Sequence, residues 1–167
     1  MKYSEIYKKW RDNPIEFWKK NAEDVSWIKF PEKILIKKNE NFYEWFSDSV
    51  MNTCYNAVDK NILEGRGNQV AIYYDSPITN SKSKLTYNEL KSKVEEFAGA
   101  LNKYNISKGD RVIVYMPMIP EAIIAVLAIA RIGAVHSVVF GGFAAKELAV
   151  RIDDCSATVS YTHLRAH

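Results

Sequence analysis

Few side chains in this 167-residue sequence have a type and spacing suited to catalysis or metal binding. His136 falls within an apolar segment with no cysteine or serine beside it, so we interpret it as a packed, hydrogen-bonded histidine rather than a general base. Asp153 and Asp154 are neighbours near the end of a predicted helix, where adjacent side chains do not face each other, which indicates a solvated helix end. His163 and His167 follow no regular pattern and indicate no metal site. The sequence therefore offers no catalytic residue and no metal ligands.

One short segment, Phe140-Gly141-Gly142, has the composition of a binding turn. A glycine pair lets a ligand approach the backbone, and a helix that starts just after it presents free N–H groups and a positive dipole end to an anion. A plain tight turn between strand and helix fits the same residues equally well. No phosphate-binding loop of the glycine–lysine–serine/threonine type occurs in the sequence. The residues alone leave both interpretations open.

The elements around this turn predict where it lies. Arg111–Met116 is β-branched and apolar, which predicts a strand covered on both faces. A helix is predicted from Pro120 to about Ile132, and Gly133 ends it. This helix has no polar residue from Ala122 to Ala130, so we expect burial around most of its circumference. Ala134–Phe140 is a second, similarly apolar strand, and the spacing predicts a parallel pair with a right-handed crossover. The turn then lies at the carboxyl end of a parallel strand, where open α/β sheets bind ligands.

The flanking segments complete an α/β pattern. Gln69–Tyr74 and Lys84–Thr86 predict a hairpin around a polar loop, and Thr86 with Glu89 forms a capping box. Apolar residues then follow at helical spacing: Leu90, Val94, Phe97, Ala98, Leu101 and Tyr104. A second amphipathic helix is predicted at Ala144–Ile152, and a third strand at Ala157–Tyr161.

The N-terminal region differs in amino-acid composition from the rest of the chain, because all four tryptophans fall between residues 2 and 45 among lysines and glutamates. Asn13–Pro14 predicts a capped helix, and Phe42–Phe46 and Tyr55–Glu64 are predicted to be helical. We interpret the tryptophans as packing anchors rather than a stacking platform, since no regular spacing groups them on one face. The predicted fold class is α/β: a helical, aromatic arm at 1–58, the first part of a layered domain with parallel strands at 59–160, and an atypical tail at 161–167.

Composition excludes several classes of protein. The net charge of +3 comes from scattered lysines with no sustained basic run, which favours neither nucleic acid nor a membrane surface as partner. Cys54 and Cys155 are too few for a disulfide framework and fit buried thiols in a reducing compartment. No signal-peptide pattern is present, and prolines and charges interrupt the apolar segment 112–140, whereas a spanning helix needs about 20 predominantly apolar residues. We expect a cytoplasmic protein.

Several longer motifs occur together in the order of a known family. Through these motifs the sequence closely resembles acyl-CoA synthetases of the acetyl-CoA synthetase type, in the adenylate-forming superfamily. The resemblance extends to about Ser160 and includes the arm. The motifs that carry it are YMPMIPE at 115–121, ARIGAVHS at 130–137, FGGF at 140–143, and Pro14, Phe17-Trp18, Trp27, Trp45-Phe46, Asn52, Tyr55-Asn56 and Asp59 in the arm. Two finer features, YDSPIT at 74–79 and FAAKEL…RID at 143–153, look more like the propionyl-CoA synthetase branch.

The resemblance implies a reaction in two steps. ATP and a short-chain carboxylate, acetate or propionate, give an acyl-adenylate and pyrophosphate, with Mg²⁺ neutralising the phosphates. Coenzyme A then displaces AMP to form the thioester. In this family the Phe-Gly-Gly turn contacts the nucleotide end of CoA, which assigns that role to Phe140, Gly141 and Gly142. The resemblance implies nothing about oligomeric state.

The family's phosphate loop, acyl pocket and mobile C-terminal domain lie beyond the segment that this sequence matches. We therefore expect an N-terminal fragment that is inactive and only marginally stable by itself, with a tail that departs from the family after Ser160. Two alternatives come from other classes. One is a non-catalytic interaction module derived from such an enzyme. The other, a response-regulator-like domain, lacks the acidic cluster it would need at a strand end.

Overall fold

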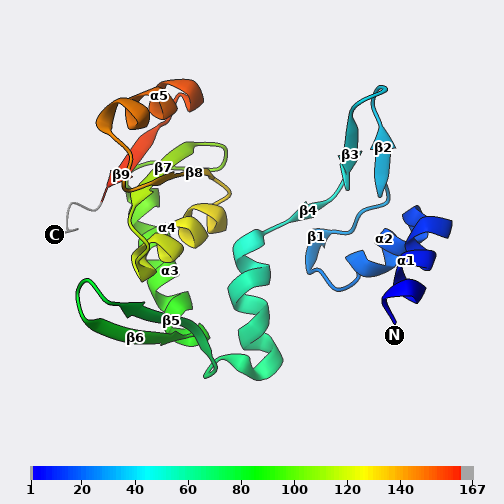
Figure 1. Ribbon diagram of the computed structural model, residues 1–167, viewed down its shortest axis with the longest axis horizontal. Coiled ribbons are helices and arrows are strands. Elements are labelled where there is room, and N and C mark those ends of the chain that lie inside the picture. Colours follow the sequence, from blue (N-terminus) through cyan, green and yellow to red (C-terminus); the bar gives the residue numbers. More distant parts are fainter. Residues whose placement is uncertain (1, 163–167) are drawn as a thin grey trace. The chain divides into compact units, whose positions relative to one another are not determined.

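The computed structural model describes residues 2–162 and divides the chain into two compact units, Met1–Asn52 and Thr53–His167. Figure 1 labels the α-helices and β-strands of each unit. Within residues 2–162, no helix is long and apolar enough to cross a membrane. The tail residues 163–167, with His163 and His167, lie outside the part described.

The first unit is only partly helical. It begins with α1 (Tyr3–Asp12) and α2 (Pro14–Ala22), and Asn13 caps α2 as expected, because its Oδ1 accepts the Glu16 N–H at 3.2 Å. Two short antiparallel strand pairs follow: β1 (Trp27–Lys29) with β4 (Val50–Met51), and β2 (Leu35–Lys37) with β3 (Tyr43–Trp45).

The helix predicted at Phe42–Phe46 is therefore wrong. Residues 43–45 form β3, in which Trp45 stands opposite Leu35 of β2. Aromatic residues fit a pleated surface with a cross-strand neighbour, and this preference outweighs helix formation in so short a segment.

The tryptophans of this unit pack locally, as the sequence predicted. The ring of Trp18 meets that of Trp45 edge-on at 5.6 Å between centroids, and Trp27 lies 5.4 Å from Phe46. The indole N–H of Trp27 also donates to the carbonyl oxygen of Ala22 at 2.7 Å, at the C-terminal end of α2. These contacts tie α2 to the strands that follow it.

The second unit is built on a parallel sheet with the strand order β8-β7-β9. Its strands are β7 (Arg111–Met116), β8 (Val135–Phe140) and β9 (Val159–Thr162), which confirms the predicted parallel pair and the third strand. The helices α4 (Pro120–Arg131) and α5 (Ala145–Cys155) join them and lie on opposite sides of the sheet (Figure 1). They do so because β8 is added on one side of β7 and β9 on the other, and both crossovers are right-handed.

The main core of this unit forms between α3 (Tyr87–Lys103), α4 and the sheet. The capping box is confirmed: the Thr86 hydroxyl accepts the Glu89 N–H at 3.3 Å, and the Glu89 carboxylate accepts the Thr86 N–H at 2.7 Å. Tyr104 is exposed rather than part of the buried face, because α3 ends just before it. The buried side chains of the predicted helix face are Leu90, Val94, Ala98 and Leu101.

A helical segment and a hairpin precede α3. The segment contains the π-helical stretches η1 (Tyr55–Asp59) and η2 (Ile62–Arg66), and Gly65 adopts a φ of 84° at its end, which glycine tolerates without strain. The predicted hairpin is confirmed as β5 (Val70–Ser76) paired with β6 (Ser81–Thr86). Its strands extend further into the polar loop than expected.

A charged cluster joins this helical segment to α3 and α4. The Arg131 guanidinium donates to both carboxylate oxygens of Asp59, at 2.7 and 3.0 Å, and to Glu95 at 2.8 Å. Lys91 lies 3.6 Å from Asp59 and 3.7 Å from Glu95. Burial alone would raise the pKa of Asp59, but the hydrogen bonds and charge of Arg131 hold it below its ordinary value.

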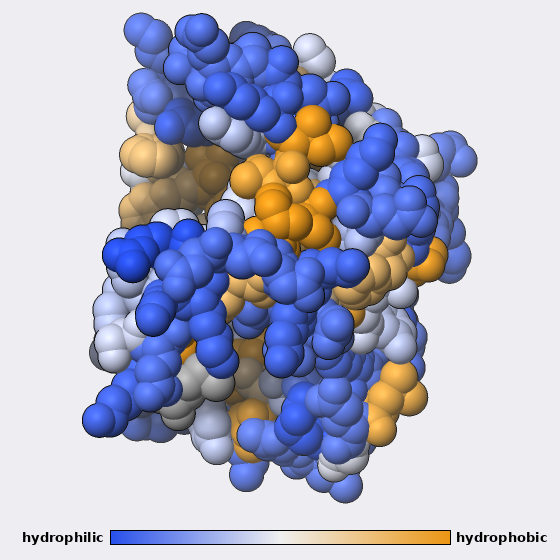
Figure 2. Space-filling model, turned by 90° about the vertical axis from the view of Figure 1, so that its right-hand side faces the viewer, coloured by the Kyte–Doolittle hydropathy of each residue, from blue (hydrophilic) through white to orange (hydrophobic). Residues whose placement is uncertain are grey.

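The predicted cover on both faces holds for β7, whereas β8, although similarly apolar, is largely uncovered. Val138 and Phe140 are 61% and 60% exposed, whereas Val139 between them is 1% exposed. β8 is one of the two outer strands of the sheet formed by residues 111–162, and its face that carries Val138 is uncovered. His136 lies on the same exposed face, so the prediction of a packed histidine is wrong. Exposed apolar side chains are not confined to β8, since they also lie among hydrophilic ones on the face of the molecule that Figure 2 shows.

The two thiols differ in burial, which gives a first testable expectation. Cys54 is fully buried, and burial raises the pKa of its thiol, whereas Cys155 is half-buried. In the native chain we expect Cys155 to react with a thiol reagent at least ~100-fold faster than Cys54, which reacts only on opening of the core. Time-resolved labelling with mass spectrometry measures both rates. The Cys155→Ser variant should lose the fast phase, and a fast phase that remains in it would contradict this assignment.

Candidate functional site

The turn Phe140-Gly141-Gly142 lies where the sequence placed it, at the carboxyl end of β8. Phe140 is opposite Met116, the last residue of the central strand β7. The N–H of Phe143 donates to the carbonyl oxygen of Phe140 at 3.1 Å and closes the turn, and α5 begins at Ala145. The turn therefore occupies the edge of the sheet at which α/β proteins bind ligands.

Space, rather than backbone conformation, accounts for the two glycines, because neither has a positive φ. A Cβ at Gly141 would lie 3.1 Å from the backbone carbon of Met116 and 3.1 Å from the nitrogen of Pro117, so only glycine permits this close approach of the turn to β7. A Cβ at Gly142 would lie 2.7 Å from Cε1 of Phe140, an exposed ring that can move. Gly142 is itself exposed, so it is the member of the pair whose backbone a ligand can reach.

The residue after the glycines, Phe143, is held from two directions. Its carbonyl oxygen accepts the Tyr115 hydroxyl at 2.6 Å, and its ring lies 4.9 Å from the guanidinium carbon of Arg151. The Phe140 ring meets the Phe143 ring edge-on at 6.0 Å. Arg151 in turn donates to the Glu147 carboxylate at 3.2 Å, one helical turn earlier. Sequence reasoning missed Tyr115 and Arg151, because no local pattern indicates which side chains meet Phe143.

The first turn of α5 adds backbone donors to this site. Its N-cap residue is Ala144, which has no side-chain oxygen to accept an N–H, and the first hydrogen bonds to the Ala144 carbonyl come from Glu147 and Leu148. The amides of Ala145 and Lys146 therefore lie at the open end of the helix, where the dipole favours negative charge. Together with the exposed backbone of Gly142, this arrangement suits a group with phosphate or carbonyl oxygens.

The other candidate residues from the sequence that lie in the described part of the chain form no catalytic or metal site in the structure. Asp153 and Asp154 are exposed near the end of α5, as predicted for a solvated helix end. In residues 2–162, no group of three His, Cys, Asp or Glu side chains is placed to hold a metal ion.

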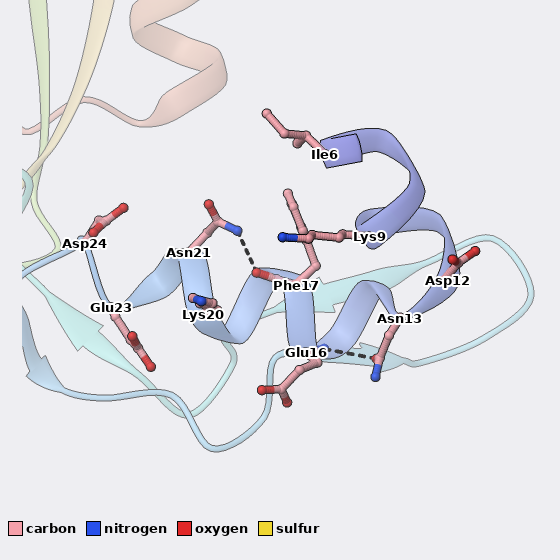
Figure 3. Close-up of a pocket in the computed structure, with 10 residues that line it drawn as sticks. All are labelled: Ile6, Lys9, Asp12, Asn13, Glu16, Phe17, Lys20, Asn21, Glu23 and Asp24. Atoms are coloured by element: carbon pink, nitrogen blue, oxygen red, sulfur yellow. Dashed lines mark hydrogen bonds between the residues drawn. The ribbon is translucent and has the colours of Figure 1, made fainter. Parts of the chain in front are cut away.

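A separate hollow lies between α1 and α2 in the first unit (Figure 3). Its lining mixes opposite charges with two apolar side chains, and two of its polar groups are engaged within α2, where Asn13 accepts the Glu16 N–H and Asn21 donates to the Phe17 carbonyl. Because no set of like groups converges on it, the hollow indicates no particular ligand. The lining residues are Ile6, Lys9, Asp12, Asn13, Glu16, Phe17, Lys20, Asn21, Glu23 and Asp24.

Comparison with known families matches both parts of the chain. The model described as AMP-binding enzyme matches residues 60–167, which is more than half of the sequence and includes the turn. The chain belongs to the AMP-binding enzyme family. The model of the acetyl-coenzyme A synthetase N-terminus matches residues 3–57. The family resemblance inferred from the sequence motifs is thereby confirmed.

Several relatives of this chain are named as synthetases. The mitochondrial acyl-CoA synthetase short-chain family member 3 of Homo sapiens is 50% identical over 150 residues, covering 90% of this chain and 22% of that protein. The protein of the same name from Bos taurus is 50% identical over 141 residues, covering 84% and 21%. The acetyl-coenzyme A synthetase of Streptomyces coelicolor is 45% identical over 159 residues, covering 95% and 24%. The chain thus spans about a fifth to a quarter of the length of these relatives.

A solved structure shares the fold. The crystal structure of Brucella canis acyl-CoA synthetase matches 68% of this chain and 20% of that chain, with a TM-score of 0.63 and 30% sequence identity. The predicted fold class, the first part of an adenylate-forming α/β domain, is confirmed by this match and by the parallel sheet.

Proposed function

We propose that this chain is the N-terminal part of an AMP-forming short-chain acyl-CoA synthetase. The complete enzyme, a chain of the relatives' length that carries this sequence, joins acetate or propionate to coenzyme A and converts ATP to AMP and pyrophosphate. The succession of the two matched family models and the synthetase names of the relatives support this assignment. The observation that links this function to particular residues of the chain is the exposed turn Phe140-Gly141-Gly142 after β8.

In this proposal the turn contacts the nucleotide end of CoA. Gly142 offers backbone without a side chain, Phe140 offers an exposed ring, and Gly141 permits the close approach to β7. The open amide end of α5 adds donors suited to an anionic ligand. CoA carries phosphates and an aromatic base, so its nucleotide end fits both kinds of group.

The remaining chemistry is not assigned to this chain. ATP supplies the adenylyl group, and Mg²⁺ balances its phosphate charge. Residues 2–162 contain no glycine–lysine–serine/threonine loop and no cluster of three metal-binding side chains, so no ATP or Mg²⁺ ligand is assigned among them. We propose a cytoplasmic location, which the two free thiols, Cys54 and Cys155, support because they fit a reducing compartment. We keep both acetate and propionate as substrates, with the motifs at 74–79 and 143–153 favouring propionate.

The Gly142→Val variant of the complete synthetase tests the proposal. The valine side chain covers the exposed backbone and displaces the Phe140 ring, so the KM for CoA should rise about tenfold or more. The rate of ATP–pyrophosphate exchange with carboxylate, measured without CoA, should stay unchanged because it reports only the adenylation step. Gly99→Val is the matched control, since a Cβ at Gly99 meets nothing within 4 Å. An unchanged KM for CoA in Gly142→Val would overturn the assignment.

A further inference from the structure

Two side chains outside the glycine turn determine where it sits. Tyr115 stands opposite Val139 on the neighbouring strand, and its hydroxyl donates to the carbonyl oxygen of Phe143 at 2.6 Å. Phe143 is the residue just before the α5 N-cap, so its carbonyl lies outside the helix and takes no part in the helical hydrogen bonds. The Tyr115 hydroxyl therefore ties the peptide that enters α5 to the central strand β7.

The second contact comes from α5 itself. The guanidinium carbon of Arg151 lies 4.9 Å from the centre of the Phe143 ring, which is the geometry of a cation–π interaction. Arg151 is kept in this direction by Glu147, through the carbonyl oxygen at 3.0 Å and the carboxylate at 3.2 Å. Phe143 is thus held at its carbonyl by β7 and at its ring by α5.

These contacts matter for binding because the turn makes few hydrogen bonds of its own. One hydrogen bond, from the Phe143 N–H to the Phe140 carbonyl oxygen, closes the turn. The backbone that follows presents the amides of Ala145 and Lys146. The orientation of the Phe143 peptide decides the direction of these amides and of the Gly142 backbone. A turn that is already held in place spares the ligand the entropy of ordering it.

We infer that Tyr115 and Arg151 are positioning residues that hold the turn 140–143 in the conformation that binds the nucleotide end of CoA. This inference rests on the proposed function. Neither side chain acts on the reacting atoms, so both act on CoA affinity and not on adenylation.

The Tyr115→Phe variant of the complete synthetase tests this inference, because it removes only the hydroxyl that Phe143 accepts and keeps the ring. We expect the KM for CoA to rise about threefold to tenfold, the range of a lost hydrogen bond. ATP–pyrophosphate exchange without CoA should be unchanged. Arg151→Lys keeps the charge but loses the planar group over the Phe143 ring, and should raise the KM for CoA in the same range.

Hydrogen exchange provides a readout that does not depend on activity. In Tyr115→Phe, amides in the peptide that covers residues 141–146 should exchange faster than in the native enzyme, as measured by mass spectrometry. Tyr104→Phe is the matched control, because the Tyr104 side chain is exposed and far along the chain from the turn. This control should change neither the KM for CoA nor the exchange rates.

The outcomes separate this inference from the proposed function. If Gly142→Val raises the KM for CoA but Tyr115→Phe and Arg151→Lys do not, the positioning roles are overturned and the turn keeps its proposed ligand. If neither Gly142→Val nor Tyr115→Phe changes the KM for CoA, the CoA role of the turn is overturned and the inference with it. Unchanged hydrogen exchange at 141–146 in Tyr115→Phe would also overturn the inference.

Discussion

The Val139→Lys variant is expected to lose the cooperative unfolding transition of the native chain, whereas Val138→Lys is expected to keep it. The two valines are neighbours on β8, but Val139 is 1% exposed and Val138 is 61% exposed. A lysine at position 139 places an ammonium group among apolar side chains with no partner, at a cost on the order of 4 kcal/mol or more. Complete domains have a total stability of about 5–15 kcal/mol, and this chain is expected to be only marginally stable, so such a loss leaves little folded protein.

At position 138 the same substitution has a different effect. Its side chain points to the exposed face of an outer strand, where surface changes alter stability by about 0.5 kcal/mol or less. A charge on an exposed strand also opposes pairing of that strand with another molecule. We therefore expect Val138→Lys to raise the soluble fraction and reduce self-association of the chain.

Urea titration followed by far-UV circular dichroism measures the first effect, and size-exclusion chromatography measures the second. The pair forms its own control, since the substitutions are chemically identical and differ only in the face of β8 that they occupy. Equal unfolding midpoints for the two variants would contradict the burial of Val139 and with it the placement of β8 in the sheet.

The sequence predicted the elements whose signals are local. Pro120 and Gly133 delimit α4, and the Thr86–Glu89 capping box starts α3, so both helices could be placed within a residue or two. The carboxyl-edge position of the turn followed from the order strand, helix, strand and turn. These features need no knowledge of which distant segments meet.

What the sequence did not predict depends on partners far along the chain. Residues 43–45 form a strand because residues 35–37 pair with them. The helix and strand propensities of a five-residue segment cannot reveal such a pairing partner. The exposure of β8 follows from the strand order, since β9 is added to the opposite side of β7. The Tyr115–Phe143 hydrogen bond joins residues 28 positions apart, and therefore only the strand register reveals it.

The charged cluster around Asp59 leads to the second large expected effect. Arg131→Met should lower the free energy of unfolding by about 3 kcal/mol, because it leaves Asp59, a residue that is 9% exposed, without its bidentate partner. Lys91, at 3.6 Å, then remains as the nearest described cation and compensates only in part. No local pattern predicts this pair, whose members are 72 residues apart. Urea titration of native and variant chains measures the difference.

An arginine with similar partners on the surface provides the control. Arg66 donates to Asn61 at 2.7 Å and pairs with Glu64, but its side chain is 45% exposed. Because water replaces these partners readily, Arg66→Met should change the free energy of unfolding by less than about 1 kcal/mol. The double variant Asp59→Leu with Arg131→Met should recover part of the loss, since removing both charges leaves neither one buried alone. A loss for Arg131→Met no larger than that for Arg66→Met would show that the cluster does not hold the helices together.

The same cluster contributes to the dependence of stability on pH. The pKa of Asp59 is held below its ordinary value in the folded chain, so its contribution to stability is fully present above the pKa of an unfolded aspartate and is lost as the pH falls through the lower, folded value. For the native chain this places the loss below about pH 4. In Arg131→Met, the burial that raises the pKa of Asp59 is no longer outweighed by the arginine. The variant should therefore show a flatter decline of the free energy of unfolding between pH 5 and pH 3, about the range in which aspartates titrate. If the free energy of unfolding falls as steeply with pH in the variant as in the native chain, the acid sensitivity belongs to other carboxylates.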